Sequence, residues 1–124
     1  MTIFEHFKSL VQAPDYLANM NQQVFSDAHG KSTRCCHREW RKSNLSYQRA
    51  VHLVRIDLAK QVLAQEQFDR ERFYFIMGYT TPWGLHHFMK GTFGLTCLEY
   101  RWKQHGYPSN KEQARRAQYK VIKQ

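Results

Sequence analysis

Residues 31–46 read KSTRCCHREWRKSNLS, and residues 80–96 read TTPWGLHHFMKGTFGLT. Both stretches open with a hydroxyl residue, continue to a bulky apolar residue followed by a base, and close with a leucine followed by a hydroxyl residue. The corresponding residues are Ser32 and Thr81, Trp40-Arg41 and Met89-Lys90, and Leu45-Ser46 and Leu95-Thr96. This repetition predicts that the chain builds one small unit twice, with a period of about fifty residues.

Apolar residues at helical spacing extend outward from both stretches and predict about seven helices. The helices are expected over residues 3–12, 21–28, 33–43, 48–64, 69–76, 82–92 and 97–104. Ser32, Ser46 and Thr81 are suited to cap three of them, and proline at position 82 is tolerated as a first helical residue. Since no segment alternates as a strand would, the predicted fold class is all-α.

Within this scheme, two helix-turn-helix subdomains are joined by a long linker helix. The first subdomain is expected over residues 1–47, the linker over 48–65, the second subdomain over 66–105 and a basic tail over 106–124. Val51, Val54, Leu58 and Val62 form the apolar stripe of the linker. Val24 and Phe25 are expected to face inward.

The helix predicted over residues 33–43 has two chemically distinct faces. Cys36 and Trp40 lie four residues apart on one stripe, and the opposite face holds Arg34, His37, Arg38 and Arg41. Residues 31–49 contain six lysines and arginines against one glutamate, in a chain of net charge +9. Such a concentration of positive charge predicts an acidic partner, above all nucleic acid.

The sequence disfavours several other classes of protein: membrane-spanning, disulfide-rich, zinc-binding and enzymatic. No apolar run is long enough to span a membrane, and three cysteines, two of them adjacent, indicate a reducing cytosol rather than a disulfide framework. Adjacent cysteines at 35 and 36 point about 100° apart on a helix and cannot readily share a zinc ion, and the same holds for the adjacent histidines at 86 and 87. Without a nucleophile–base pair, phosphate loop or carboxylate dyad, neither an enzyme nor a cofactor is expected.

Residues 73–101, FYFIMGYTTPWGLHHFMKGTFGLTCLEYR, resemble the signature segment of the AraC/XylS family of bacterial transcription regulators. The matching residues are Gly78-Tyr79, Thr80-Thr81, Lys90, Phe93-Gly94, Leu95-Thr96 and Glu99-Tyr100-Arg101. Residues 52–65 resemble the linker helix of that family, and residues 30–42 resemble its first recognition helix. Cys97 and Met89 depart from the family pattern, which usually has proline and phenylalanine there.

The resemblance implies a sequence-specific DNA-binding regulator, an activator by class, that inserts two recognition helices into successive major grooves. Side-chain chemistry then suggests a role for each outward residue. In the first unit, Arg34 and Arg38 can bind guanine, His37 can reach a base edge, Thr33 can contact phosphate or a thymine methyl, and Arg41 and Lys42 can bind phosphate. In the second unit the outward residues are Pro82, Trp83, His86 and His87, with Lys90 toward the DNA backbone. The first unit is expected to supply most of the affinity and specificity.

Alternatives remain open at this stage. Exposed arginines can simply be solvated, both histidines can face solvent or pack on a neighbouring helix, and Trp83 can pack on one rather than contact DNA. The chain most resembles the short, single-domain (MarA/SoxS-like) members of the family, which implies a cytoplasmic, nucleoid-associated monomer without a small-molecule effector. RNA polymerase is a further partner that this resemblance suggests. Two other functions compete: an adaptor or antagonist that binds RNA polymerase or another regulator, and a nonspecific architectural DNA binder.

Overall fold

A computed structural model describes residues 1–106, so the basic tail predicted over 106–124 lies, beyond its first residue, outside the described part. The described residues form helices and no strand, which confirms the all-α prediction. The helices are α1 (Ile3–Leu10), α2 (Gln22–His29), α3 (Thr33–Lys42), α4 (Tyr47–Leu63), α5 (Arg70–Ile76), α6 (Pro82–Phe93) and α7 (Cys97–His105). Each one begins and ends within about two residues of the range expected from the sequence.

The predicted caps begin the helices as expected. The side chain of Ser32 accepts a hydrogen bond from the amide of Cys35, at 3.2 Å, and Ser46 and Thr81 cap α4 and α6 in the same way. Pro82 occupies the first turn of α6, where its missing N–H costs nothing. Gly30 ends α2 in the left-handed region, with φ of 73°, which favours glycine at the turn into α3.

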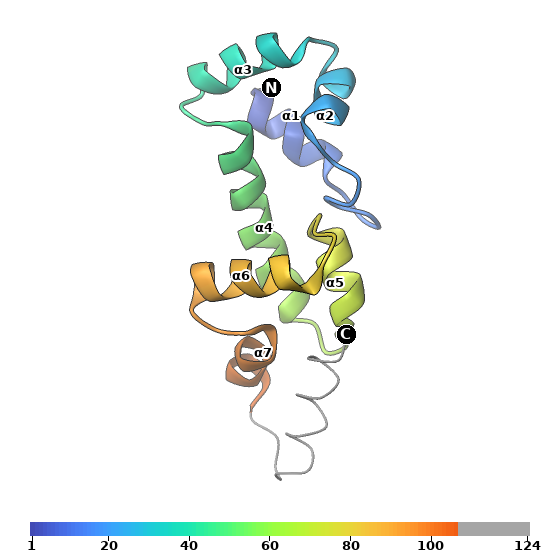
Figure 1. The fold of residues 1–124 in the computed structure, drawn as a ribbon, viewed down its shortest axis with the longest axis vertical. Coiled ribbons are helices and arrows are strands. Elements are labelled where there is room, and N and C mark those ends of the chain that lie inside the picture. Colours follow the sequence, from blue (N-terminus) through green and yellow to red (C-terminus); the bar gives the residue numbers. More distant parts are fainter. Residues whose placement is uncertain (107–124) are drawn as a thin grey trace.

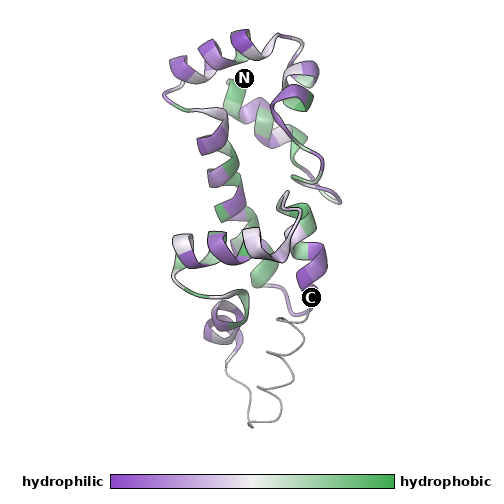
Figure 2. Ribbon diagram, in the orientation of Figure 1, coloured by the Kyte–Doolittle hydropathy of each residue, from purple (hydrophilic) through white to green (hydrophobic). Residues whose placement is uncertain are grey.

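Two hydrophobic clusters lie one above the other along the long axis, and α4 contributes to both (Figures 1 and 2). The N-terminal cluster buries Ile3, Phe7, Val11, Leu17, Phe25, Cys36, Trp40, Ala50 and Val54. The C-terminal cluster buries Leu58, Ala59, Leu63, Phe73, Ile76, Met77, Leu85, Phe88, Met89 and Cys97. Helices α1 and α2 pack on α3 in the first, and α5 packs on α6 in the second.

Two predictions about buried positions are wrong in detail. Val24 is 43% exposed, because the turn of α2 that buries Phe25 directs its neighbour outward. In α4, Val51 and Val62 are only half-buried, whereas Ala59 and Leu63 are fully buried. A single straight stripe does not describe α4, because its two ends face different clusters.

A polar bridge joins the two clusters beside α4. The amide of Leu17 donates to the carbonyl of Ile76, at 2.9 Å, and Nε of Arg55 donates to the carbonyl of Met77, at 2.8 Å. The Arg55 guanidinium also lies 4.1 Å from the ring centroid of Tyr79, and burial lowers the pKa of Arg55 from its ordinary value. The Leu17 hydrogen bond attaches the C-terminal cluster to the loop that follows α1, so the two clusters do not depend on α4 alone for their relative placement. The Arg55 contacts strengthen the attachment of α4 itself to the end of α5.

Helix α7 is held in place by the first and last residues of the motif Glu99-Tyr100-Arg101. Thr96 and Glu99 form a reciprocal capping box, and the hydrogen bonds from Thr96 lower the pKa of Glu99. Arg101 donates to the carbonyls of Leu63, Gln65 and Glu66 at distances of 3.2, 2.7 and 3.0 Å. Because these carbonyls lie at and beyond the C-terminal end of α4, Arg101 satisfies acceptors that the helix itself leaves free.

Candidate nucleic-acid interface

Helix α3 buries one face and presents a basic one. Cys36 and Trp40 are 3% and 2% exposed, and the Trp40 ring packs against Phe7 and Phe25 in the N-terminal cluster, with ring centroids 6.1 and 5.7 Å apart. Every residue of α3 predicted to contact DNA is exposed: Thr33, Arg34, His37, Arg38, Arg41 and Lys42. The structure therefore brings all six predicted residues together on one helix and turns them toward solvent.

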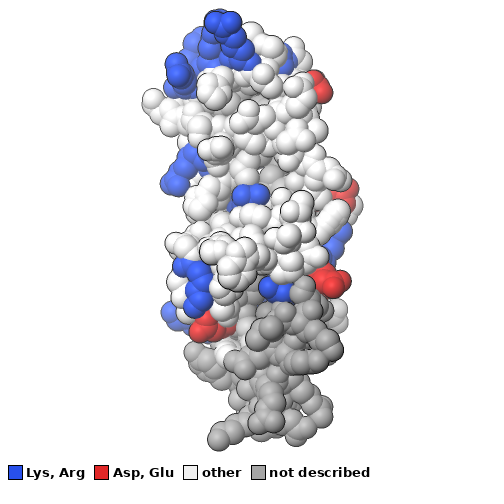
Figure 3. Space-filling model, viewed as in Figure 1, with Lys and Arg blue, Asp and Glu red and all other residues white. Residues whose placement is uncertain are grey.

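The arginines on this face are not paired with any carboxylate in the part of the chain that the structure describes. Glu39 is the one acidic residue between positions 28 and 56, and its carboxylate accepts hydrogen bonds from Lys31 and His29. Among residues 1–106, no carboxylate lies within salt-bridge distance of Arg34, Arg38 or Arg41. Figure 3 shows lysine and arginine atoms gathered over α3 at one end of the molecule.

A chain of hydrogen bonds holds α3 against the helices behind it. Nδ1 of His6, on α1, lies 2.6 Å from Nδ1 of His29, on α2, and Nε2 of His29 lies 3.0 Å from the carboxylate of Glu39. The His29 ring also stacks on Phe25 at 5.3 Å. Hydrogen bonding to Lys31, and secondly to His29, lowers the pKa of Glu39, so the carboxylate stays charged and α3 stays tethered.

Helix α6 differs from α3 in what it presents. It buries Leu85, Phe88 and Met89 in the C-terminal cluster. At position 84 only glycine fits closely, because a Cβ there would lie 2.7 Å from the ring of Tyr79. In the first two turns of α6 the other face carries Trp83, His86 and His87 but no charged side chain.

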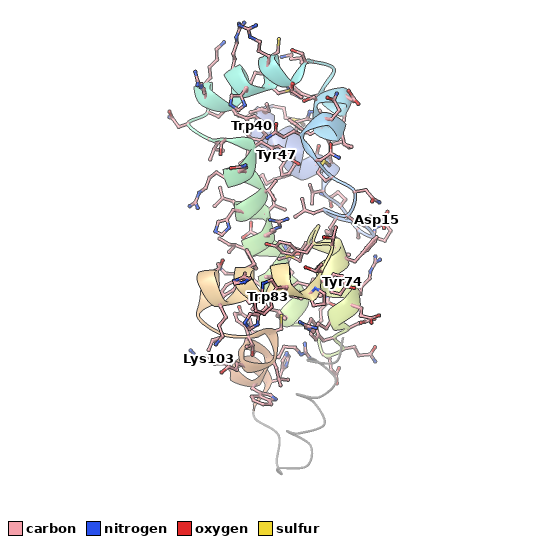
Figure 4. All side chains as sticks on the ribbon, viewed as in Figure 1. Asp15, Trp40, Tyr47, Tyr74, Trp83 and Lys103 are labelled. Carbon is pink, nitrogen blue, oxygen red and sulfur yellow. The ribbon has the colours of Figure 1, made fainter. Side chains whose placement is uncertain are left out.

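The Trp83 side chain is 67% exposed, which excludes the alternative that it is a core residue. Its ring stacks on His86, with centroids 5.5 Å apart and planes 13° apart, and His87 meets its edge at 4.7 Å. These contacts are between residues three and four apart on one helix, so they orient the indole without burying it. Figure 4 labels Trp83 on α6 and, by contrast, Trp40 and Tyr47 where α3 meets α4.

The remaining predicted residues of α6 are less available than expected. Pro82 is half-buried, and Nζ of Lys90 lies 3.5 Å from the carboxylate of Glu99, so the one lysine of α6 already has an acidic partner. In Figure 1, α3 and α6 cross the long axis in the same direction on either side of the middle of α4. The surface over the first turns of α6 is almost uncharged in Figure 3.

Two residues of α4, Arg49 and His52, lie near α3 and α6 respectively although they were not predicted as contacts. Arg49 is exposed in the first turn of α4, directly after the loop that follows α3. His52, also on α4, faces α6 and meets the Phe88 ring at 5.7 Å, beside an open groove that His87 also lines. The count of basic residues over 31–49 could have indicated Arg49, whereas no sequence pattern places His52 beside α6.

Neither the adjacent cysteines at 35 and 36 nor the adjacent histidines at 86 and 87 suggest a metal centre. Cys35 is exposed while Cys36 is buried, as expected for neighbours on a helix. Residues 1–106 contain no group of three or more histidine, cysteine or acidic side chains arranged to hold a metal ion. Over the same residues, no helix has the length and apolar character that crossing a bilayer requires.

Comparisons with protein-family models, with curated proteins and with solved structures found no match to this chain. The geometry of α3 and α6 is therefore the basis for assigning a function.

Proposed function

We propose that this chain is a sequence-specific DNA-binding transcription regulator, in which α3 and α6 act as recognition helices in successive major grooves. The observation that carries the proposal is the outward face of α3, where exposed arginines have no acidic partner among residues 1–106 and stand on a helix whose other face is packed in the N-terminal cluster. A recognition helix requires this combination, because it must be held rigidly while its polar side chains reach base edges.

The roles follow from position along α3. Arg34 and Arg38 lie one turn apart on one face, where each guanidinium can donate two hydrogen bonds to O6 and N7 of a guanine. His37 lies beside them and can reach a base edge. Arg41 and Lys42, in the last turn, and Arg49, at the start of α4, are placed to bind phosphate.

The spacing of the two helices is compatible with successive grooves. Helix α4 has 17 residues and is about 25 Å long at 1.5 Å per residue. Adjacent major-groove entries lie about 34 Å apart, and the widths of the units at either end of α4 supply the difference. The resemblance of residues 73–101 to AraC/XylS regulators supports the same arrangement, in the form of a cytoplasmic, nucleoid-associated monomer that activates transcription together with RNA polymerase.

In vitro selection of bound duplexes, followed by titration at several salt concentrations, tests the proposal. We expect a selected sequence, and a linear fall of log K with log salt, with a slope between about −4 and −8 at −0.9 per neutralised phosphate. Arg38→Ala should weaken binding by about 1–3 kcal/mol and relax the preference at one base pair. Lys8→Ala is the matched control, because this substitution removes the same charge from α1 rather than from α3.

The other outcomes identify the competing functions. Salt-dependent binding without a selected sequence would indicate an architectural DNA binder. A slope near zero, with no retained duplex, would indicate an adaptor that binds RNA polymerase or another regulator, and would refute the proposal.

A further inference from the structure

The Trp83 side chain is exposed although nothing in the fold requires it to be. It contributes to neither cluster, and its ring contacts are made with His86 and His87 of its own helix. Stacking on His86, at an interplanar angle of 13°, fixes the orientation of the indole. The result is a flat apolar surface of defined orientation on the outward side of α6.

The chemistry of α6 excludes the mode of recognition available to α3. No arginine or lysine occurs in α6 before Lys90, and Lys90 is paired with Glu99 at 3.5 Å. The bidentate contact of arginine to guanine is therefore not available in the first two turns, where a recognition helix contacts bases. What these turns offer instead is an indole in contact with two imidazoles, those of His86 and His87.

In the major groove of DNA, the apolar group is the C5 methyl of thymine. We propose that α6 recognises A·T base pairs, with the Trp83 indole packed against thymine methyl groups and His86 acting as a positioning residue for the ring. The inference rests on the proposed function, since it requires α6 to lie in the major groove. The basic surface of α3 and the net charge of +9 favour DNA over a protein as the occupant of this face.

The full binding site would then be chemically asymmetric. The half-site facing α3 contains guanines bound by Arg34 and Arg38, and the half-site facing α6 contains thymines whose methyl groups contact Trp83. Most of the salt dependence belongs to the first half-site, because the second is bound mainly through apolar contact.

Replacing thymine by deoxyuridine tests this, because it removes the methyl group and leaves the hydrogen-bonding groups of the base pair unchanged. Starting from a duplex selected by the full-length protein, the thymines of each half-site are replaced separately. For wild-type protein we expect affinity to fall about fourfold per contacted methyl in the α6 half-site. Trp83→Ala should bind the thymine and deoxyuridine duplexes equally, whereas Arg38→Ala should keep the wild-type ratio.

A His86→Ala variant tests whether the stacked imidazole contributes to methyl recognition. It should reduce the thymine-to-deoxyuridine ratio while leaving thermal unfolding near the wild-type temperature. Trp83→Phe, which keeps an aromatic ring at the same position, should restore part of the ratio that Trp83→Ala loses.

The inference is overturned if wild-type protein does not distinguish the two duplexes, or if Trp83→Ala retains the full ratio. It is also overturned if Trp83→Ala binds the selected duplex as tightly as wild type does, which would leave the indole free for a protein partner. Each of these results leaves the proposed function intact, provided that selection yields a sequence and Arg38→Ala weakens binding. If selection yields no sequence, both the proposed function and this inference fail.

Discussion

Trp40 of α3 and Trp83 of α6 provide a direct test of the packing described above. Trp40 is 2% exposed and Trp83 is 67% exposed, so the same substitution to alanine removes a core residue from α3 and a surface residue from α6. An indole that is fully buried removes about 200 Å² of surface from water, worth about 5 kcal/mol at 25 cal/mol per Å². Measured tryptophan-to-alanine substitutions in cores cost about 3–5 kcal/mol, and we expect about 4 kcal/mol for Trp40→Ala.

For Trp83→Ala the same arithmetic gives a much smaller cost. About a third of the side chain is buried, which corresponds to about 1.6 kcal/mol. Alanine recovers about 0.5 kcal/mol through its higher helix propensity. The net loss should therefore be about 1 kcal/mol, or about 3 kcal/mol less than for Trp40.

Urea denaturation followed by far-ultraviolet circular dichroism measures both costs. Because whole domains are stable by only about 5–15 kcal/mol, Trp40→Ala should shift the unfolding midpoint strongly, or unfold the N-terminal cluster before the C-terminal one. DNA affinity, measured under conditions where both variants are folded, should rank them the other way. Trp83→Ala should lose affinity while remaining folded. Equal costs for the two substitutions, or a larger cost for Trp83, would show that α6 does not present its indole as described and would refute this reasoning.

Three further predictions concern Gly78 in the loop after α5, the three cysteine thiols, and the Glu39 carboxylate that holds α3 against α2. Gly78→Ala should cost about 2–3 kcal/mol, because φ is +83° there and a Cβ would lie 3.1 Å from the nearest backbone oxygen; thermal unfolding measures the loss. A maleimide should label one cysteine of the native protein, the exposed Cys35, since burial raises the pKa of Cys97 to about 11 and keeps that thiol protonated; mass spectrometry counts the labels. The hydrogen bond from Lys31 lowers the pKa of Glu39 below its ordinary 4.5. The charged carboxylate therefore stabilises the fold fully above about pH 4.5, and this stabilisation is lost as the pH falls through the lowered pKa of the folded state. The stability of Glu39→Gln, measured by unfolding, should depend less on pH over that range.

Each of these has a matched control in the chain. Gly30→Ala shares the positive φ of 73° but meets no atom within 4 Å, so it should cost about 1 kcal/mol, the backbone strain alone. In the labelling experiment, Cys36 is a buried neighbour of the reactive thiol, and rapid reaction at two sites would contradict the burial described. For the pH experiment, Glu71→Gln removes an exposed carboxylate that has no salt-bridge partner among residues 1–106, and should leave the pH dependence as in wild type.

The helices and their caps could be predicted from the sequence because their causes are local. Ser32 accepts a hydrogen bond from an amide three residues away, and Pro82 needs no partner in its position. The basic face of α3 is similarly local, since four-residue spacing of Cys36 and Trp40 determines which side chains point outward. The fold class follows from these features, whereas the arrangement as two DNA-binding units remains the proposal made above.

What the sequence did not reveal depends on contacts between distant residues. The hydrogen bonds from His6 to His29 and on to Glu39 join three helices, and no spacing along the chain indicates them. Burial in α4 was misassigned because a helix between two clusters does not keep one buried stripe. For Trp83 the sequence left core and surface open, since an aromatic residue at the start of a helix suits either, and only the positions of the surrounding helices decide between them.

Helix α4 joins two units of different surface chemistry in one continuous chain, and no symmetry axis relates them. A protein of this kind, bound as a single copy, has a direction on DNA. Turning its site end for end would reverse which unit lies upstream, and with it every surface that faces a neighbouring protein on the same duplex. For the regulator proposed here, the orientation of the site relative to a promoter would therefore carry information that a palindromic operator cannot hold.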